Sequence, residues 1–201
     1  MEKYIYRVVN IVGKIDFNGI DNDELVYGLL EIADKENAEI IEKYRPTKRK
    51  NPDGRAFPAI SIRWGNPPYT TVIFKRRWGG KTNIICTGLK TEEELRRVDE
   101  DLKSKLSNHF PSKNIETKAS VVNFVVSGYL NRRVDLEKIN EIAPDFFYDP
   151  EQFPGGIFKL NNLTILLFSN GKFVCPTPRI EYMEEVIKRL YHGLEENNIL
   201  F

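Results

Sequence analysis

Four phenylalanines and two asparagines recur at matching places in the two halves of this 201-residue chain. Aromatic rings can pack against the flat faces of bases, and amide side chains can donate hydrogen bonds to base edges. A repeated pair of each suits a partner with approximate two-fold symmetry, such as duplex DNA. The set consists of Phe57, Phe74, Phe153, Phe168, Asn10 and Asn123.

Each half contains the same series of predicted elements around these residues. The order is an Asn-bearing strand, a short helix, a Phe–Pro strand, a strand ending in Phe, a Gly–Lys turn, a Cys-bearing strand and a long charged helix. The predicted helices cover 21–34, 91–106, 134–143 and 178–198. The offset between matching residues falls from 113 at the asparagines to 89 at the cysteines, which indicates insertions at 43–55 and 75–81. The sequence therefore predicts two repeats, 1–112 and 113–201, forming one intramolecular pseudo-dimer.

Both faces of the predicted strands are apolar. Because side chains i and i+2 of a strand share a face, Val8, Asn10 and Val12 lie on one face, and Val9 and Ile11 on the other. The second half repeats this pattern around its own asparagine. Four helices can cover only one face of ten strands, and an uncovered apolar face of this size marks a binding surface.

This arrangement resembles the TATA-box-binding protein family over roughly residues 5–197. The second half carries the resemblance in VVNFVVSGYL, YDPEQFPGGIFKL and LLFSNGKFVC, and the first half in VVNIVGKIDF, FPAISIR, TTVIF and CTGLKTEEE. The resemblance implies an α+β saddle, in which two pseudo-symmetric repeats form one curved ten-stranded antiparallel sheet with four helices on its convex side. It also implies a general transcription initiation factor that binds TATA-like A·T-rich promoter DNA and needs no cofactor.

The resemblance further implies roles for individual residues. The four phenylalanines kink the duplex at flexible steps such as TA; this family is itself the standard example of such wedges, so the general rule adds no independent support. A·T pairs present mainly acceptors in the minor groove, which the two asparagines can meet. The residues expected in the groove are Asn10, Asn123, Val12, Val125, Val72, Leu166, Ile85, Val174 and Thr87. Those expected on phosphates are Arg63, Lys81, Lys90, Lys159, Lys172 and Arg179.

An acidic loop in the second half is expected to bind a protein. Asp149 and Glu151 flank Pro150, which keeps the short loop extended and its acids outward. Phosphates would repel this loop, so a basic protein surface is its natural partner. In the family that the chain resembles, the partner is a transcription factor IIB-type protein, with IIA-type or other regulators on the convex face.

Three segments depart from the family pattern. The insertion 43–55 is basic and is either a solvated loop or an extra phosphate contact, and the hairpin 75–81 is also lengthened. Pro176 stands in the second half where the first half has Thr87. Since proline cannot donate a ladder hydrogen bond, either the strand ends early or a bulge brings Thr177 to the face.

The composition is typical of an ordinary intracellular globular protein, nuclear in a eukaryote and cytoplasmic in an archaeon. Hydrophobic residues make up 41%, without an 18-residue apolar run that would indicate a membrane span. Residues 1–112 hold 20 Lys/Arg and 17 Asp/Glu, a net +3, and residues 113–201 hold 10 and 12, a net −2. This balance counts mildly against a nucleic-acid binder, but the acids crowd into the predicted helices. Cys86 and Cys175 are expected to be free thiols on the helix-facing side.

The sequence does not indicate an enzyme. It lacks a Gly-rich phosphate loop opening a helix, and its two cysteines and two histidines lack metal-ligand spacing, so no catalytic residue or metal site is expected. Two alternatives stay open: a paralogue of the family that reads DNA weakly, and a protein-interaction module that binds a regulatory protein through the sheet. Retention of all four phenylalanines favours DNA, because neither alternative needs paired wedges.

Overall fold

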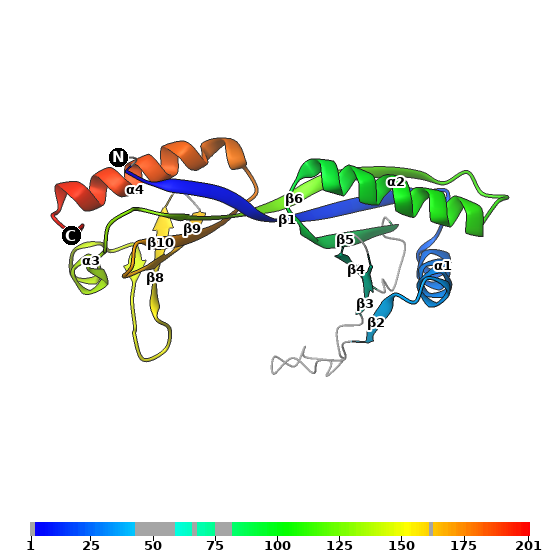
Figure 1. Ribbon diagram of the computed structural model, residues 1–201, viewed down its shortest axis with the longest axis horizontal. Helices are drawn as coiled ribbons and strands as arrows, with labels where there is room; N and C mark the ends of the chain where they lie inside the picture. The colour runs from blue at the N-terminus through cyan, green and yellow to red at the C-terminus, as the bar shows by residue number, and fades with distance from the viewer. Residues whose placement is uncertain (1–2, 43–58, 66–67, 75–81, 161–162) are drawn as a thin grey trace. The chain divides into compact units, whose positions relative to one another are not determined.

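The computed structural model describes residues 3–42, 59–65, 68–74, 82–160 and 163–201. The chain divides into two compact units. Unit 1 combines the residues up to Asn10 with Asn123–Phe201, and unit 2 is Ile11–Val122. Two long strands, β1 (Ile5–Asn18) and β6 (Glu116–Tyr129), contribute residues to both units (Figure 1). The boundary between the units therefore runs through these strands, whereas the two sequence repeats meet near residue 112.

The remaining elements belong to one unit each. Unit 2 contains α1 (Asn22–Lys35), β2 (Glu39–Glu42), β3 (Ala59–Trp64), β4 (Tyr69–Phe74), β5 (Thr82–Leu89) and α2 (Glu92–His109). Unit 1 contains α3 (Leu136–Ile142), β7 (Phe146–Phe147), β8 (Gly155–Leu160), β9 (Leu163–Phe168), β10 (Lys172–Thr177), the 3₁₀ turn η1 (Ile180–Tyr182) and α4 (Met183–Glu196). The strands are hydrogen-bonded in the order β2-β3-β4-β5-β1-β6-β10-β9-β8-β7. Ten antiparallel strands and four α-helices in the described residues confirm the predicted α+β class.

The two helices of unit 2 begin at capping boxes. The Asp21 carboxylate accepts from the Glu24 amide at 2.8 Å, and the Glu24 carboxylate accepts from the Asp21 amide at 3.1 Å. Thr91 and Glu94 make the same reciprocal pair at the start of α2. Both pairs satisfy amides that a helix N-terminus leaves free, so the local sequence fixes where α1 and α2 start.

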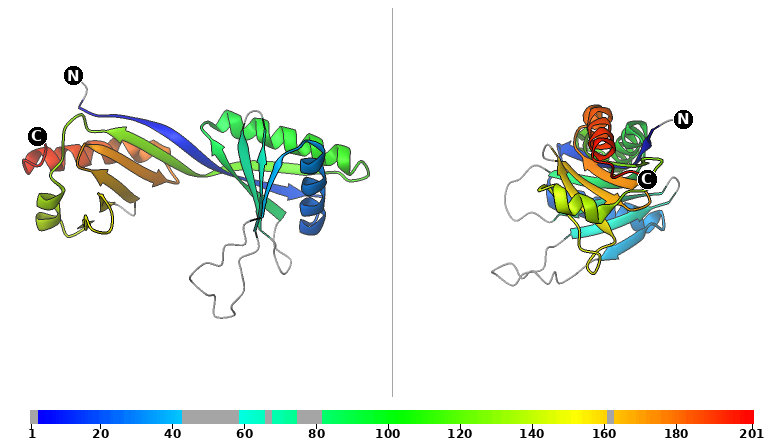
Figure 2. Two further views of the ribbon diagram at one scale, coloured as in Figure 1. Left: turned by 60° about the horizontal axis from the view of Figure 1, so that its bottom comes forward. Right: turned by 90° about the vertical axis from the view of Figure 1, so that its left-hand side faces the viewer.

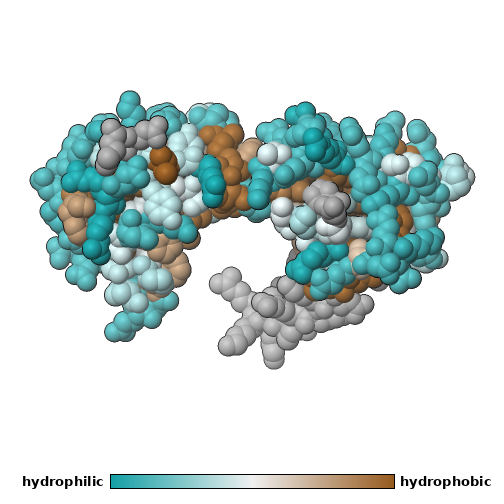
Figure 3. Space-filling view, viewed as in Figure 1, coloured by the Kyte–Doolittle hydropathy of each residue, from teal (hydrophilic) through white to brown (hydrophobic). Residues whose placement is uncertain are grey.

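The long helices pack on one face of the strands in each unit. In unit 2, α2 lies across the strands so closely that a Cβ added to Gly13 would come within 2.3 Å of Leu95 Cδ1 (Figure 2). In unit 1, the core joins Phe173 and Cys175 of β10 to Ile187 and Leu190 of α4. The helix surfaces visible in Figure 3 are largely hydrophilic. No helix in the described part of the chain has the length and apolar character of a membrane span.

The predicted alternation holds along most strands and is wrong at one place. Val12 is half-buried and Ile11 is buried in unit 2, as predicted. Val8, however, packs against the core of unit 1, while Val9 lines a cavity on the other side. Val8 and Ile11 thus both face a core, although strict alternation would put them on opposite faces of the strand. The change of face falls between Val8 and Ile11, where β1 passes from unit 1 to unit 2. The register shift between Ile11 and Gly13 adds a residue to β5 and leaves Ile11, Gly13 and Ile15 all buried.

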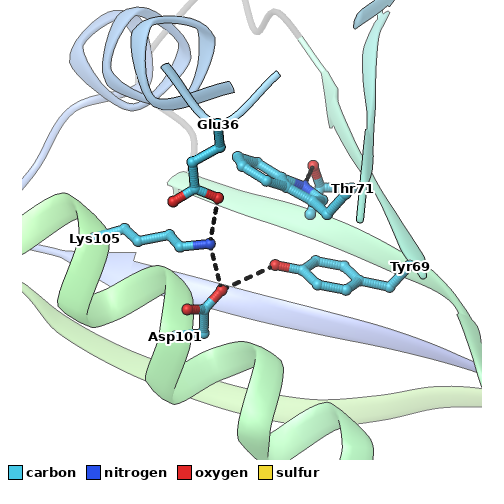
Figure 4. A network of polar contacts seen from close by, with 6 residues as sticks. Glu36, Tyr69, Thr71, Asp101 and Lys105 are labelled. Carbon is cyan, nitrogen blue, oxygen red and sulfur yellow. Dashed lines mark hydrogen bonds and ion pairs between the residues drawn. The ribbon is translucent and has the colours of Figure 1, made fainter. Parts of the chain in front are cut away.

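Trp64 has a structural position that the sequence did not reveal. Its indole is buried, donates to the Thr71 hydroxyl at 3.0 Å and stacks on Tyr69. The Lys105 ammonium lies 5.1 Å from the Trp64 ring centroid and forms an ion pair with Asp101 at 2.8 Å (Figure 4). Burial, followed by the nearby Asp101 carboxylate, raises the pKa of Tyr69. This network joins α2 to the β3–β4 hairpin.

Both cysteines are free and buried, and both lie on the helix-facing side, as predicted. Burial raises the pKa of Cys86 to about 12 and that of Cys175 to about 11. Since the thiolate is the reactive form, we expect the folded protein at pH 8 to react with a disulfide reagent at least about a hundredfold more slowly than the unfolded chain. Rapid labelling of either thiol without denaturant would contradict the buried positions.

Candidate nucleic-acid interface

The strand face opposite the helices, here called the open face of each unit, is lined by half-buried apolar side chains. In unit 2, it includes four predicted groove residues: Val12, Val72, Ile85 and Thr87. Their strand neighbours Ile73, Ile84 and Cys86 are almost fully buried. In unit 1, the open face includes Val125, Leu166 and Val174, again beside fully buried neighbours. The structure thus gathers the predicted groove residues of each unit on one face.

The second-half phenylalanines form a ring pair on the open face of unit 1. Phe153 and Phe168 meet edge to face with ring centroids 5.8 Å apart, and Phe153 remains 38% exposed. Gly155 makes the pair possible, because a Cβ there would lie 2.9 Å from an atom of each ring. Gly156 has the opposite role on the core side, where a Cβ would overlap Phe146. The two glycines of the PGG sequence therefore leave room for the ring pair on one face and for Phe146 in the core on the other.

The first-half pair is described only in part. Phe74 is half-buried at the end of β4, opposite Ala59 of β3. Phe57 lies outside the described residues, as do Lys81, the whole basic insertion 43–55 and the hairpin 75–81.

Asn10 and Asn123 are both half-buried. They stand where β1 and β6 pass from one unit to the other, since Asn10 ends one segment of unit 1 and Asn123 begins the next. Asn123 alternates with the buried Phe124, which places it on the same face as Val125.

The predicted phosphate-binding residues fall into two groups. Arg63, Lys159 and Lys172 belong to open-face positions of β3, β8 and β10. Lys90 instead lines a cavity together with Trp64 and residues of α2, and Arg179 lies over the Tyr182 ring beside α4. The structure does not bring these last two to the open face.

Both explanations considered for Pro176 are wrong. β10 continues through Thr177 in an unbroken register against β6, with Pro176 opposite Val125. Pro176 is exposed on the open face, and Thr177 is fully buried, where its hydroxyl accepts from the Arg179 amide at 3.1 Å. In the described part of the chain, β9 pairs with β10 only at Phe173 and Val174. Pro176 therefore has a ladder partner there on one side only, and its missing N–H is tolerated.

The acidic loop differs from the expectation that both acids point outward. The Asp149 carboxylate accepts from the Glu151 amide at 3.1 Å and from the Gln152 side-chain amide at 2.5 Å. The Asp149 carbonyl accepts from the Phe153 amide at 3.0 Å. Asp149 is therefore half-buried and holds the loop that carries Phe153, whereas Glu151 is exposed.

Several open-face residues were missed by the sequence reasoning. Lys14 and Asp16 continue the alternation of Val12 and form an ion pair at 2.8 Å, so the same periodicity could have found them. Arg7 and Tyr129 line a cavity of about 620 Å³ beside Lys172. Arg7 is hidden from strict alternation, because β1 changes phase between the two units. Among the described residues, no cluster of His, Cys, Asp or Glu could hold a metal ion.

Comparison with known proteins places this geometry in a family. The chain is 30% identical over 199 residues to the TATA-box-binding protein of Pyrobaculum calidifontis, which covers 98% of this chain and 89% of the relative. The chain belongs to the TATA-box-binding protein family. It is also 31% identical over 198 residues to the TATA-box-binding protein of Pyrococcus horikoshii. The family model described as transcription factor TFIID, or TATA-binding protein, matches residues 118–197.

The fold agrees with this assignment to the TATA-box-binding protein family. The structure of Methanococcus jannaschii TBP superposes with a TM-score of 0.71 at 24% identity, covering 95% of this chain and 98% of that chain. The family model matches within the second repeat, where the sequence motifs ran with almost no gaps.

The exposure of the ring pair predicts how the phenylalanines affect stability. Phe153→Ala and Phe168→Ala should each cost less than about 2 kcal/mol, because each ring is only partly buried. Phe173→Ala, whose ring is fully buried in the core of unit 1, should cost about 3–5 kcal/mol. Urea unfolding of the three variants measures this difference. A cost for Phe153→Ala equal to that for Phe173→Ala would place the ring in the core.

Proposed function

We propose that this protein is a transcription initiation factor that binds A·T-rich promoter DNA through the open faces of its two units and kinks it. The observation that carries the proposal is the Phe153–Phe168 pair, an aromatic pair left partly exposed on an apolar strand face in a member of this family. An apolar strand face of this kind is otherwise unfavourable in water, so it indicates a partner.

The chemistry of the open faces suits the minor groove. Valine, leucine and isoleucine side chains pack against A·T pairs but would leave a guanine amino group unpaired. Asn10 and Asn123 can donate to the acceptors of adenine and thymine. A ring that enters between base steps costs unstacking energy, which is least at pyrimidine–purine steps such as TA. Preference for A·T-rich sequence thus follows from both contact and deformation.

Phosphate contacts supply the rest of the affinity. Lys159 and Lys172 lie on the open face of unit 1 without an ion-pair partner among the described residues. Each is therefore available to displace a counterion from DNA, and such displacement makes binding depend on salt. Asp149 and Glu151 are excluded from this role by their charge.

The double substitution Phe153→Ala/Phe168→Ala tests the proposal. The wild-type protein should bind a TA-containing duplex more tightly than a G·C-rich duplex of equal length, as measured by fluorescence anisotropy. The variant should lose at least tenfold in affinity and should bend the duplex less, as measured by energy transfer between its labelled ends, because one kink is lost.

The matched control is Phe201→Ala, which removes an exposed ring of unit 1 that is remote in sequence from the open-face strands. It should leave both readouts unchanged. If the double variant bends DNA as the wild type does, the rings are not wedges. If the wild type binds neither duplex, the alternative of a protein-interaction module replaces this proposal.

We further propose that the loop 149–153 contacts a basic, transcription factor IIB-type protein. Glu151 is exposed and carries the charge outward, while Asp149 holds the loop in shape through the Glu151 and Phe153 amides. The two acids therefore have separate roles, one in contact and one in positioning.

Charge reversal at Glu151 isolates the contact. Glu151→Lys should leave binding to DNA alone intact or slightly stronger, and should weaken assembly with a purified IIB-type factor at least tenfold in a gel shift. Asp149→Asn keeps an oxygen acceptor for the loop amides and should have a smaller effect. Glu196→Lys, an exposed reversal at the end of α4, serves as the control. Ternary assembly that survives Glu151→Lys would remove this assignment.

A further inference from the structure

The open face of unit 2 carries its own anion beside its cation. Lys14 Nζ lies 2.8 Å from Asp16 Oδ2 on β1, and both residues alternate with buried core positions. The other Asp16 oxygen, Oδ1, is buried without a hydrogen-bond donor among the described residues. The Asp16 carboxylate therefore depends on Lys14, and it holds that ammonium within the unit.

The equivalent place in unit 1 has the opposite character. Strand register defines the equivalence: Gly13 pairs with Cys86 in unit 2 as Val126 pairs with Cys175 in unit 1. Three residues further along each strand pair, the positions differ in charge. Asp16 pairs with Asn83 in unit 2, whereas the corresponding pair in unit 1 is Tyr129 with Lys172. Arg7 lines the same cavity as Tyr129 and Lys172 and has no ion pair among the described residues, so unit 1 presents free cations there.

A second cation of unit 2 is held in the same way. Arg63 Nη1 lies 2.9 Å from Glu39 Oε2, across the β2–β3 ladder in which these two residues are direct partners. Lys159 occupies the equivalent position of unit 1, since it faces Thr164 as Arg63 faces Thr70. The Lys159 amide donates to the Asp145 carbonyl at 2.9 Å, yet no ion pair joins their side chains.

We propose that Asp16 and Glu39 are internal counterions that compete with DNA phosphate for Lys14 and Arg63. The sheet of unit 1 then makes more phosphate contacts through its own strands than the sheet of unit 2, and Arg7 is one of those contacts. This inference rests on the proposed function, because it concerns how strongly each open face holds the duplex.

The two pairs should differ in strength. The Lys14 and Asp16 side chains are 34% and 24% exposed, whereas Arg63 and Glu39 are 57% and 61% exposed. Exposed ion pairs are weak and readily exchanged for another anion, while partly buried pairs are screened less. Asp16 is therefore the stronger competitor, and its neutralisation should change DNA binding more than that of Glu39.

The test is the salt dependence of binding to a TA-containing duplex, measured by anisotropy over a salt series. Asp16→Asn should steepen the slope of log K against log salt by about 0.9 and tighten binding about threefold at low salt, since Lys14 is released to one phosphate. The gain should vanish in Asp16→Asn/Lys14→Gln. Glu39→Gln should act in the same direction but less, and Arg7→Gln should flatten the slope by about 0.9.

Asp145→Asn is the matched control, because it removes the same charge at the position in unit 1 equivalent to Glu39 but breaks no ion pair. It should leave the slope unchanged, and thermal unfolding should show all variants folded. An unchanged slope in Asp16→Asn, or an equal increase in Asp145→Asn, would overturn the inference while leaving DNA binding established. A wild-type protein without affinity for the duplex overturns the proposed function instead, and the inference falls with it.

Discussion

Each unit of this protein has strands that are apolar on both faces but helices on only one. In unit 2, α2 covers Gly13 so closely that a Cβ there would displace the Leu95 side chain, and in unit 1, α4 completes a core around Phe173 and Cys175. Burial of these residues provides the main driving force for folding. The opposite face keeps Val12, Val72, Val125 and similar side chains only half-buried, and the proposed binding of DNA depends on that exposed apolar area.

The aromatic pair and the charged residues determine how the open face can contact a partner. The Phe153–Phe168 pair depends on Gly155 for space and on Asp149 for the loop that carries the first ring. A loop residue whose charge repels phosphate thus shapes a wedge proposed to enter DNA. The cations are distributed unevenly, since unit 2 pairs Lys14 and Arg63 with its own carboxylates.

The sequence predicted the elements well because their signals are local. Capping boxes at Asp21 and Thr91 start helices, and period-two alternation correctly separated buried Cys86 from half-buried Ile85. The same rule failed at Val8, because β1 serves two cores and changes phase between them. That change depends on tertiary packing, which a single strand does not encode.

The errors at the site have the same origin. Nothing in CPTPR reveals that β10 is paired on one side only near Pro176, and so the prediction of an early end or a bulge was wrong. Similarly, the role of Asp149 depends on amides two and four residues away, which its charge alone does not indicate. Residues whose role depends on register or on a turn need the structure.

We propose that DNA contacts the open faces and not the helices. Backbone amide NMR during titration with a TA-containing duplex tests this directly, because the strands and the helices both carry amide protons. We expect large shifts at the amides of Val12, Val72, Val125, Leu166 and Val174, with those of the exposed residues Arg96 of α2 and Lys188 of α4 little changed. Shifts concentrated on α2 and α4, with the open-face amides unmoved, would contradict DNA binding by the open faces.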